Sequence, residues 1–212
     1  MNSINTVIWD FNGTLIDDAE AALCAVNDML TKRNQSPIDK TKYAAAVDTP
    51  IWKFYEVVFE EGSITPEEAV VEFNSGYEKY LPANPLMEGA KEMLEYFKSL
   101  GFTQLVVSAS HIDKVQAKLE SLGLLGYFDT VLALSDYNAG DKTYLARKYL
   151  DDNGISPENA VVIGDCVFDC KMAEAIGACC ILTTQGHQTI TELSVTSAEV
   201  VDSLLEIRNI IK

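Results

Sequence analysis

The chain has 212 residues, 48% of them hydrophobic, and a formal net charge of −16 at pH 7. This length accommodates one large domain or a core with a small second domain, and the acidic surface argues against nucleic acid as a partner. No apolar run reaches the length of a membrane span and no signal pattern opens the chain, so we expect a cytoplasmic protein without a membrane partner.

The first predicted element is a strand that ends at Asp10. An apolar, β-rich run, Val7-Ile8-Trp9, stops abruptly at this carboxylate, and Gly13 follows three residues later. Such a run is typical of a buried parallel strand, which would deliver Asp10 to the carboxyl edge of a sheet, where ligands bind in open α/β folds. Gly13 allows the backbone to turn tightly around a ligand.

Residues 16–84 are predicted to be entirely helical. Apolar periodicity and breaker residues indicate helices over 16–34, 39–47, 51–60 and 65–81. The last of these has a strong start signal, because Thr65 can cap, Pro66 suits the first turn and Glu68 can complete a capping box. We therefore predict an all-helical insertion between the first strand and the rest of the sheet.

From residue 85 onward, strands and helices alternate. The predicted strands cover 104–108, 128–134, 160–165 and 178–183, and the predicted helices cover 90–100, 112–122, 142–150, 168–176 and 203–211. This rhythm predicts a parallel sheet with right-handed crossovers. The predicted fold class is α/β: a Rossmann-like, three-layer α/β/α core over 1–15 and 85–212, with residues 16–84 as a helical second domain.

Three later sites could serve phosphate chemistry, and the first two contain Ser108 and Lys142. Ser108 ends a predicted strand, and its hydroxyl and the following N–H groups, starting with Ala109, could bind phosphate oxygens. Lys142 is the first residue of a predicted helix, where the macrodipole disfavours a cation. A nearby acidic site would explain a positive charge at this position. Lys148 is the alternative candidate.

Two further carboxylates follow the strand over 160–165. Asp165 ends that strand and Asp169 follows four residues later. Together with Asp10 they would repel one another unless a cation lies between them. Clustered oxygen ligands with open positions suit Mg²⁺. The five cysteines, odd in number, are expected to be reduced, and their spacing does not match a common zinc module.

The stretches that contain Asp10, Ser108, Lys142 and Asp165 resemble, in this order along the chain, the four motifs of the haloacid dehalogenase-like hydrolases, which are mostly phosphatases. The stretch Asp10-Phe-Asn12-Gly13-Thr14 is similar to their Asp-x-Asp-Gly-Thr signature, and the carboxylate pair is similar to their Gly-Asp-x-x-x-Asp motif. The helical insertion after the first motif is similar to the cap of the branch that contains phosphoglycolate phosphatases and β-phosphoglucomutases.

This resemblance implies a Mg²⁺-dependent phosphatase for a small phosphorylated metabolite. Asp10 would be the nucleophile that forms an aspartyl-phosphate. The metal would be held by Asp10, the backbone carbonyl of Asn12 and Asp165, with support from Asp169. The residues implied in binding the substrate or its phosphoryl group are Gly13, Thr14, Ser108, Ala109 and Lys142.

Asn12 departs from the family pattern, which has an Asp that protonates the leaving group. An amide cannot do so, and losing general acid help costs about 10²–10⁴ in rate. Four readings follow: a slow phosphatase that prefers good leaving groups, a proton donor elsewhere, the cap-lysine chemistry of phosphonoacetaldehyde hydrolases with Lys53 as amine, or a binding protein on a weakened scaffold. If Asn12 has simply replaced the acid, Asn12→Asp is predicted to raise turnover on alkyl phosphates.

We expect the cap to set the identity of the substrate, especially residues 47–54, which should close over the site. We also consider His111 a residue that could face the opening. The expected assembly is a monomer or a weak homodimer.

Overall fold

A computed structural model describes residues 4–47, 51–135 and 142–212. Within them the chain forms a parallel sheet in the order β3-β2-β1-β4-β5-β6, with β1 near its centre. The strands are β1 (Thr6–Trp9), β2 (Thr103–His111), β3 (Thr130–Leu134), β4 (Ala160–Gly164), β5 (Cys179–Thr183) and β6 (Glu199–Val201). The predicted parallel sheet is confirmed.

Helices cover both faces of this sheet. Val7 and Trp9 of β1 pack in one apolar cluster with helices α5 (Ala90–Ser99), α6 (Ile112–Ser121) and α10 (Ile207–Ile210). Ile8, between them, packs in a second cluster with α7 (Lys142–Asp152) and α8 (Val167–Ile176). Since successive side chains of a strand point to opposite faces, β1 is buried on both sides. The predicted three-layer α/β/α architecture is confirmed.

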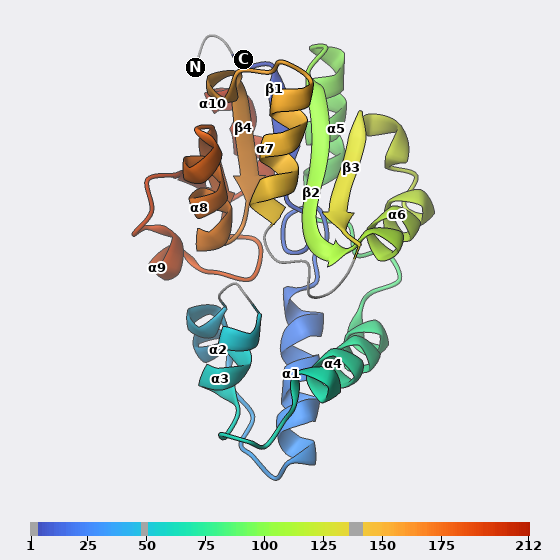
Figure 1. Ribbon diagram of the computed structural model, residues 1–212, viewed down its shortest axis with the longest axis vertical. Helices are drawn as coiled ribbons and strands as arrows, with labels where there is room; N and C mark the ends of the chain where they lie inside the picture. The colour runs from blue at the N-terminus through green and yellow to red at the C-terminus, as the bar shows by residue number, and fades with distance from the viewer. Residues whose placement is uncertain (1–3, 48–50, 136–141) are drawn as a thin grey trace.

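Four further helices form what we term the helical unit, residues 19–80. They are α1 (Ala19–Lys32), α2 (Lys40–Ala46), α3 (Trp52–Val58) and α4 (Pro66–Tyr80). They have an apolar cluster of their own, in which Met29 and Leu30 of α1 pack with Phe54 of α3 and Ala69 of α4. Figure 1 shows them at one end of the molecule, beyond the arrowheads of β2 and β4.

The predicted capping box at the start of α4 is confirmed. Thr65 Oγ1 accepts a hydrogen bond from Glu68 N at 3.2 Å, and Glu68 Oε2 accepts one from Thr65 N at 2.9 Å. Pro66 occupies the first turn, where its missing N–H costs no hydrogen bond. Local sequence alone therefore determines where this helix begins.

Two connecting segments join the helical unit to the sheet. They lie side by side, because Asp17 N donates to Pro85 O at 2.7 Å and Met87 N donates to Leu15 O at 3.0 Å. Leu15 and Ile16 are buried in the apolar cluster beneath the sheet. The helix predicted from residue 16 consequently begins only at Ala19, because Ile16 is held by the core rather than by the helix.

The C-terminal third differs from the sequence prediction in its short elements. The predicted helix over 203–211 is a 3₁₀ turn, η3 (Leu204–Glu206), followed by the single turn of α10. Residues 184–202, for which the sequence pattern predicts no element, contain α9 (Ile190–Leu193) and the edge strand β6. Elements of three or four residues are too short to show a hydrophobic period. The remaining 3₁₀ turns are η1 (Leu125–Tyr127) and η2 (Pro157–Asn159).

Strand β2 is longer than predicted. It continues through Ser108 to His111, with an irregular register against β3 between these two residues. Among the described residues, no helix combines the length and apolar character needed to cross a membrane.

Candidate active site

The register of the sheet brings three of the predicted side chains to one edge. Trp9 of β1 is aligned with Val106 of β2 and with Ile163 of β4. Asp10 follows Trp9 directly, and its N–H donates to Ile163 O at 2.9 Å. Ser108 and Asp165 come two residues after their aligned strand positions, so they flank Asp10 on either side. The chain runs from β1 to β2 and β3 on one side and then crosses back to β4 on the other side of β1, and such a reversal of strand order is the usual ligand position in open α/β sheets.

Lys142, the first residue of α7, supplies a buried positive charge at this edge. Its Nζ forms an ion pair with Asp10 Oδ1 and lies 2.7 Å from Asp169 Oδ1, and its side chain is 5% exposed. Burial would lower the pKa of Lys142, but the two carboxylates outweigh burial and raise it. The ammonium therefore stays charged, and the choice of Lys142 over Lys148 agrees with this geometry.

Asp10 lies among more negative charges than Lys142 can balance. Burial raises the pKa of Asp10, Lys142 opposes that effect, and the Asp169 and Asp165 carboxylates add to it. The pKa of Asp165 is raised too, chiefly by burial. An oxygen-rich cluster with excess negative charge fits a hard divalent cation such as Mg²⁺.

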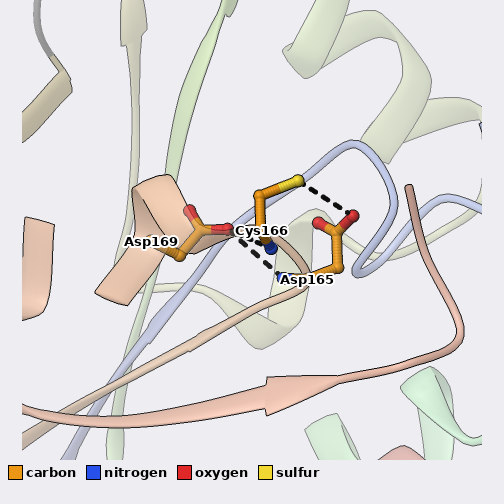
Figure 2. Close-up of side chains that lie close together, drawn as sticks. All are labelled: Asp165, Cys166 and Asp169. Carbon is orange, nitrogen blue, oxygen red and sulfur yellow. Dashed lines mark hydrogen bonds between the residues drawn. The ribbon is translucent and has the colours of Figure 1, made fainter. Parts of the chain in front are cut away.

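Figure 2 shows how Asp165 and Asp169 are held at the end of β4. Asp169 Oδ2 accepts hydrogen bonds from Asp165 N at 3.2 Å and from Cys166 N at 3.1 Å, which fixes the carboxylate at the start of α8. Cys166 Sγ donates to Asp165 Oδ2 at 3.4 Å. Ligand atoms of these three residues lie within 4.8 Å of one another. Burial raises the pKa of the Cys166 thiol, so the carboxylates rather than a thiolate are the ligands available for a metal.

Gly13 and Thr14 lie behind Asp165 rather than at the cavity. Gly13 has a φ of +76°, and a Cβ atom there would lie 2.3 Å from Asp165 Oδ2. Thr14 is fully buried, and its Oγ1 donates to Asp165 Oδ1 at 3.0 Å. The two residues, predicted to bind substrate, do not line the cavity and contact Asp165, a predicted metal ligand.

A cavity of about 380 Å³ lies between this edge and the helical unit. Asp10, Lys142 and Asp165 line it from the sheet, and Ala45 and Val47 line it from the end of α2. The predicted site residues Asn12, Asp169 and Ala109 also line it, whereas Ser108 is buried just beneath, with its Oγ accepting from Ser110 N at 3.0 Å.

Other candidates lie elsewhere. Lys53 lines an adjoining hollow of about 370 Å³ with Trp52 and Glu56. This hollow shares Ala45 with the cavity that contains Asp10, but Lys53 does not line that cavity. Lys148 is exposed and paired with Asp152. His111 caps α6, because its Nδ1 accepts from Asp113 N at 3.3 Å. Of the segment 47–54 predicted to close over the site, Val47 lines the cavity and residues 48–50 lie outside the described residues.

Sequence reasoning missed Asp18 and His187. His187, in the loop after β5, donates its backbone N–H to Asp165 Oδ2 at 2.7 Å, and its Nε2 lies 3.3 Å from Asp18 Oδ1. Burial would lower the pKa of His187, but Asp18 outweighs it and raises the pKa to about 9. The rule that identified Ser108, a polar residue at the end of a buried strand, does not reach His187, which lies four residues after Thr183, the last residue of β5.

A comparison with known proteins agrees with these features. The family model described as haloacid dehalogenase-like hydrolase matches residues 7–183. The probable phosphatase IndB of Dickeya dadantii is 27% identical over 211 residues, covering 95% of this chain and 90% of that protein. A phosphoglycolate phosphatase of Xylella fastidiosa is 25% identical over 194 residues, covering 87% of this chain and 82% of that protein.

Solved structures agree on the fold. A haloacid dehalogenase-like hydrolase from Streptococcus pneumoniae superposes with a TM-score of 0.84 at 20% identity, over 100% of both chains. Because the family model spans most of the chain, including β1, β2 and β4 and the three strand ends that flank the cavity, this protein belongs to the haloacid dehalogenase-like hydrolase family.

Proposed function

We propose that this protein is a Mg²⁺-dependent phosphatase that hydrolyses a small phosphate monoester through Asp10, with the helical unit acting as a cap. The observation that carries the proposal is the buried Asp10–Lys142 pair, which lies beside two further buried carboxylates at a cavity that the end of α2 also lines. An anionic cluster with one fixed ammonium suits phosphoryl transfer, which depends on positioning and electrostatics.

In the first step, an Asp10 oxygen would attack phosphorus while the bond to the leaving oxygen breaks, and the leaving alkoxide or aryloxide would take its proton from water. Water would then attack the phosphorus of the aspartyl-phosphate, which releases inorganic phosphate and restores the carboxylate. Lys142 Nζ, already paired with Asp10, would neutralise charge on the transferring phosphoryl group, and Ser108 and the N–H of Ala109 would position its oxygens.

The Mg²⁺ would be held by Asp10, the backbone carbonyl of Asn12 and Asp165. Asp169 would support the site, because it accepts hydrogen bonds from two backbone N–H groups and pairs with Lys142. When bound, the metal supplies charge neutralisation and orientation of the phosphate. Among the described residues, Lys142 is the lysine within ion-pair distance of any of these three carboxylates, and it pairs with Asp10 and Asp169.

A cavity of this volume suits a small metabolite. Its described lining mixes carboxylates with the apolar side chains of Ala45, Val47 and Phe168. Relatives with 25% identity are named phosphoglycolate phosphatases, so phosphoglycolate heads the set of phosphorylated metabolites to be screened. Because Asn12 cannot donate a proton, substrates with good leaving groups should turn over fastest.

The test is an assay with an aryl phosphate in Mg²⁺, comparing the native chain with Asp10→Asn. We expect turnover to fall below detection in Asp10→Asn while the circular dichroism spectrum is retained. Asp17→Asn is the matched control, since Asp17 is exposed and lies on the connecting segment. Turnover by Asp10→Asn above a small fraction of the native rate would refute the nucleophile assignment.

A binding protein on the same scaffold is the competing function, and the amide at position 12 is the observation that favours it. The same assay separates the two. A native chain that binds inorganic phosphate or a phosphate monoester in calorimetry, yet turns over neither aryl nor alkyl phosphates, would be a binding protein.

A further inference from the structure

The Asn12 side chain is held from both sides. Its Oδ1 accepts a hydrogen bond from Ser110 Oγ at 2.8 Å, and its Nδ2 donates to Asp18 Oδ2 at 2.6 Å. Nδ2 also lies 3.3 Å from the Tyr77 hydroxyl oxygen. An amide can satisfy an acceptor and a donor in this way because it carries both functions on one planar group.

Asp18 is the residue on which these contacts converge. It is 1% exposed and directly precedes α1. Its Oδ2 accepts from Tyr77 Oη at 2.6 Å as well as from Asn12, and its Oδ1 accepts from Gly13 N at 2.7 Å and faces His187 Nε2. A buried carboxylate is stable only when hydrogen-bond donors surround it. Replacing one of these donors with an acceptor would therefore destabilise the Asp18 carboxylate.

The outer ends of this network reach two different helices of the cap. Tyr77 belongs to α4. His187 Nδ1 lies 3.0 Å from the hydroxyl of Tyr43, which belongs to α2. Beside it, Gln188 Nε2 donates to Val47 O at 3.0 Å, and Gln188 Oε1 accepts from Val167 N at 2.7 Å. The cap therefore contacts the edge of the sheet at two places, through Tyr77 of α4 and through Tyr43 and Val47 at α2. Asn12 and Asp18 lie between them.

We propose that Asn12 is a positioning residue that seats the cap over Asp10 by holding the Asp18 carboxylate. This inference rests on the proposed phosphatase function for its kinetic consequences, but not for its structural ones. A carboxylate at position 12 would face the Asp18 carboxylate at hydrogen-bond distance, and the two like charges would repel. The amide at position 12 and the carboxylate at position 18 are thus matched as donor and acceptor.

This match changes what the Asn12→Asp substitution should do. The gain in turnover expected for a restored acid requires that the new carboxyl group keep the place of the amide. With Asp18 present, the single substitution should instead loosen the cap. The gain of about 10²-fold on alkyl phosphates should require neutralisation of position 18 as well.

The structural experiment is a double-mutant cycle read by backbone hydrogen exchange in α2 and α4, without substrate. The four chains are native, Asn12→Asp, Asp18→Asn and the double variant. We expect Asp18→Asn to speed exchange in these helices roughly tenfold when position 12 is Asn, and to slow it when position 12 is Asp. A change in the same direction in both backgrounds would overturn the proposal. The native sample is first checked by mass for deamidation at Asn12-Gly13.

A second variant tests the proposal without changing the loop that contains Asn12 and Asp18. Tyr77→Phe removes the hydroxyl that reaches Asp18 and should raise KM about tenfold with kcat within about twofold, together with faster exchange in α4. Tyr80→Phe is the control, because the Tyr80 hydroxyl bonds Asp28 within the cap. Equal behaviour of the two variants would also overturn the proposal. If no substrate is turned over, the proposed phosphatase function fails, while the exchange results still decide the role of Asn12.

Discussion

Gly13 links backbone conformation to the metal ligands. Its φ of +76° is one that side chains rarely adopt, and a Cβ would overlap the Asp165 carboxylate. We predict that Gly13→Ala lowers kcat/KM at fixed Mg²⁺ by more than about tenfold, because Asp165 must move, and that it lowers the free energy of unfolding by about 1–3 kcal/mol. Steady-state kinetics over a Mg²⁺ series and urea unfolding measure the two effects.

Gly123→Ala is the matched control for this substitution. Gly123 has a similar φ of +68° but has no atom within 4 Å of where a Cβ would lie. The Gly123→Ala variant should lose about 1 kcal/mol of stability from backbone strain and should keep its activity. Equal activity losses in the two variants would mean that strain alone, and not the position of Asp165, explains the effect of Gly13→Ala.

Between elements, the His187–Asp18 pair joins the loop after β5 to the start of α1. Burial would raise the pKa of Asp18, but His187, Tyr77 and Asn12 together lower it, and the pKa of His187 is raised to about 9. A histidine whose pKa is raised on folding stabilises the fold fully below its usual pKa of about 6.5 and loses that contribution as pH rises through about 9. Folding lowers the pKa of Asp18, so the stabilisation that its carboxylate gives the fold is lost as the pH falls below about 4.

We therefore predict that His187→Gln costs stability at pH 6 and much less near pH 9.5. The upper bound on the difference is about 3 kcal/mol, from the shift of His187 to about 9. Urea unfolding of the native chain and the variant at a series of pH values measures it, with His111→Gln as the control for the other histidine. A difference in stability that does not change with pH would contradict the ion pair.

For the whole molecule, the net charge of −16 sets the conditions for phosphate chemistry. A surface this acidic repels anionic substrates, so local cations must attract them. We predict that turnover requires a divalent cation, with Mg²⁺ effective and Ca²⁺ poor, because Ca²⁺ accepts more ligands in looser geometry. Dialysis against chelator followed by readdition of each metal measures this requirement. Full activity in excess chelator would exclude the metal role.

Much of the sheet and the site could be predicted from local sequence. β1 is apolar on both faces because it is buried between two layers of helices, so Val7-Ile8-Trp9 and the carboxylate after it were recognisable without neighbours. The capping box at Thr65 is likewise local, since all its partners lie within four residues. Parallel strands align their carboxyl ends, so strand-end residues such as Ser108 and Asp165 could be expected near Asp10.

Only the tertiary structure decided the surroundings of Asn12. Asp18, Tyr77 and Ser110 meet its amide from separations of 6, 65 and 98 residues, and contacts across such distances leave no periodic trace in the sequence. Lys53 shows the reverse case: its aromatic neighbours fitted a buried amine, but α3 places it on a different hollow. The chemical character of the strand ends follows from residue order, whereas which side chain faces which depends on how the cap packs on the sheet.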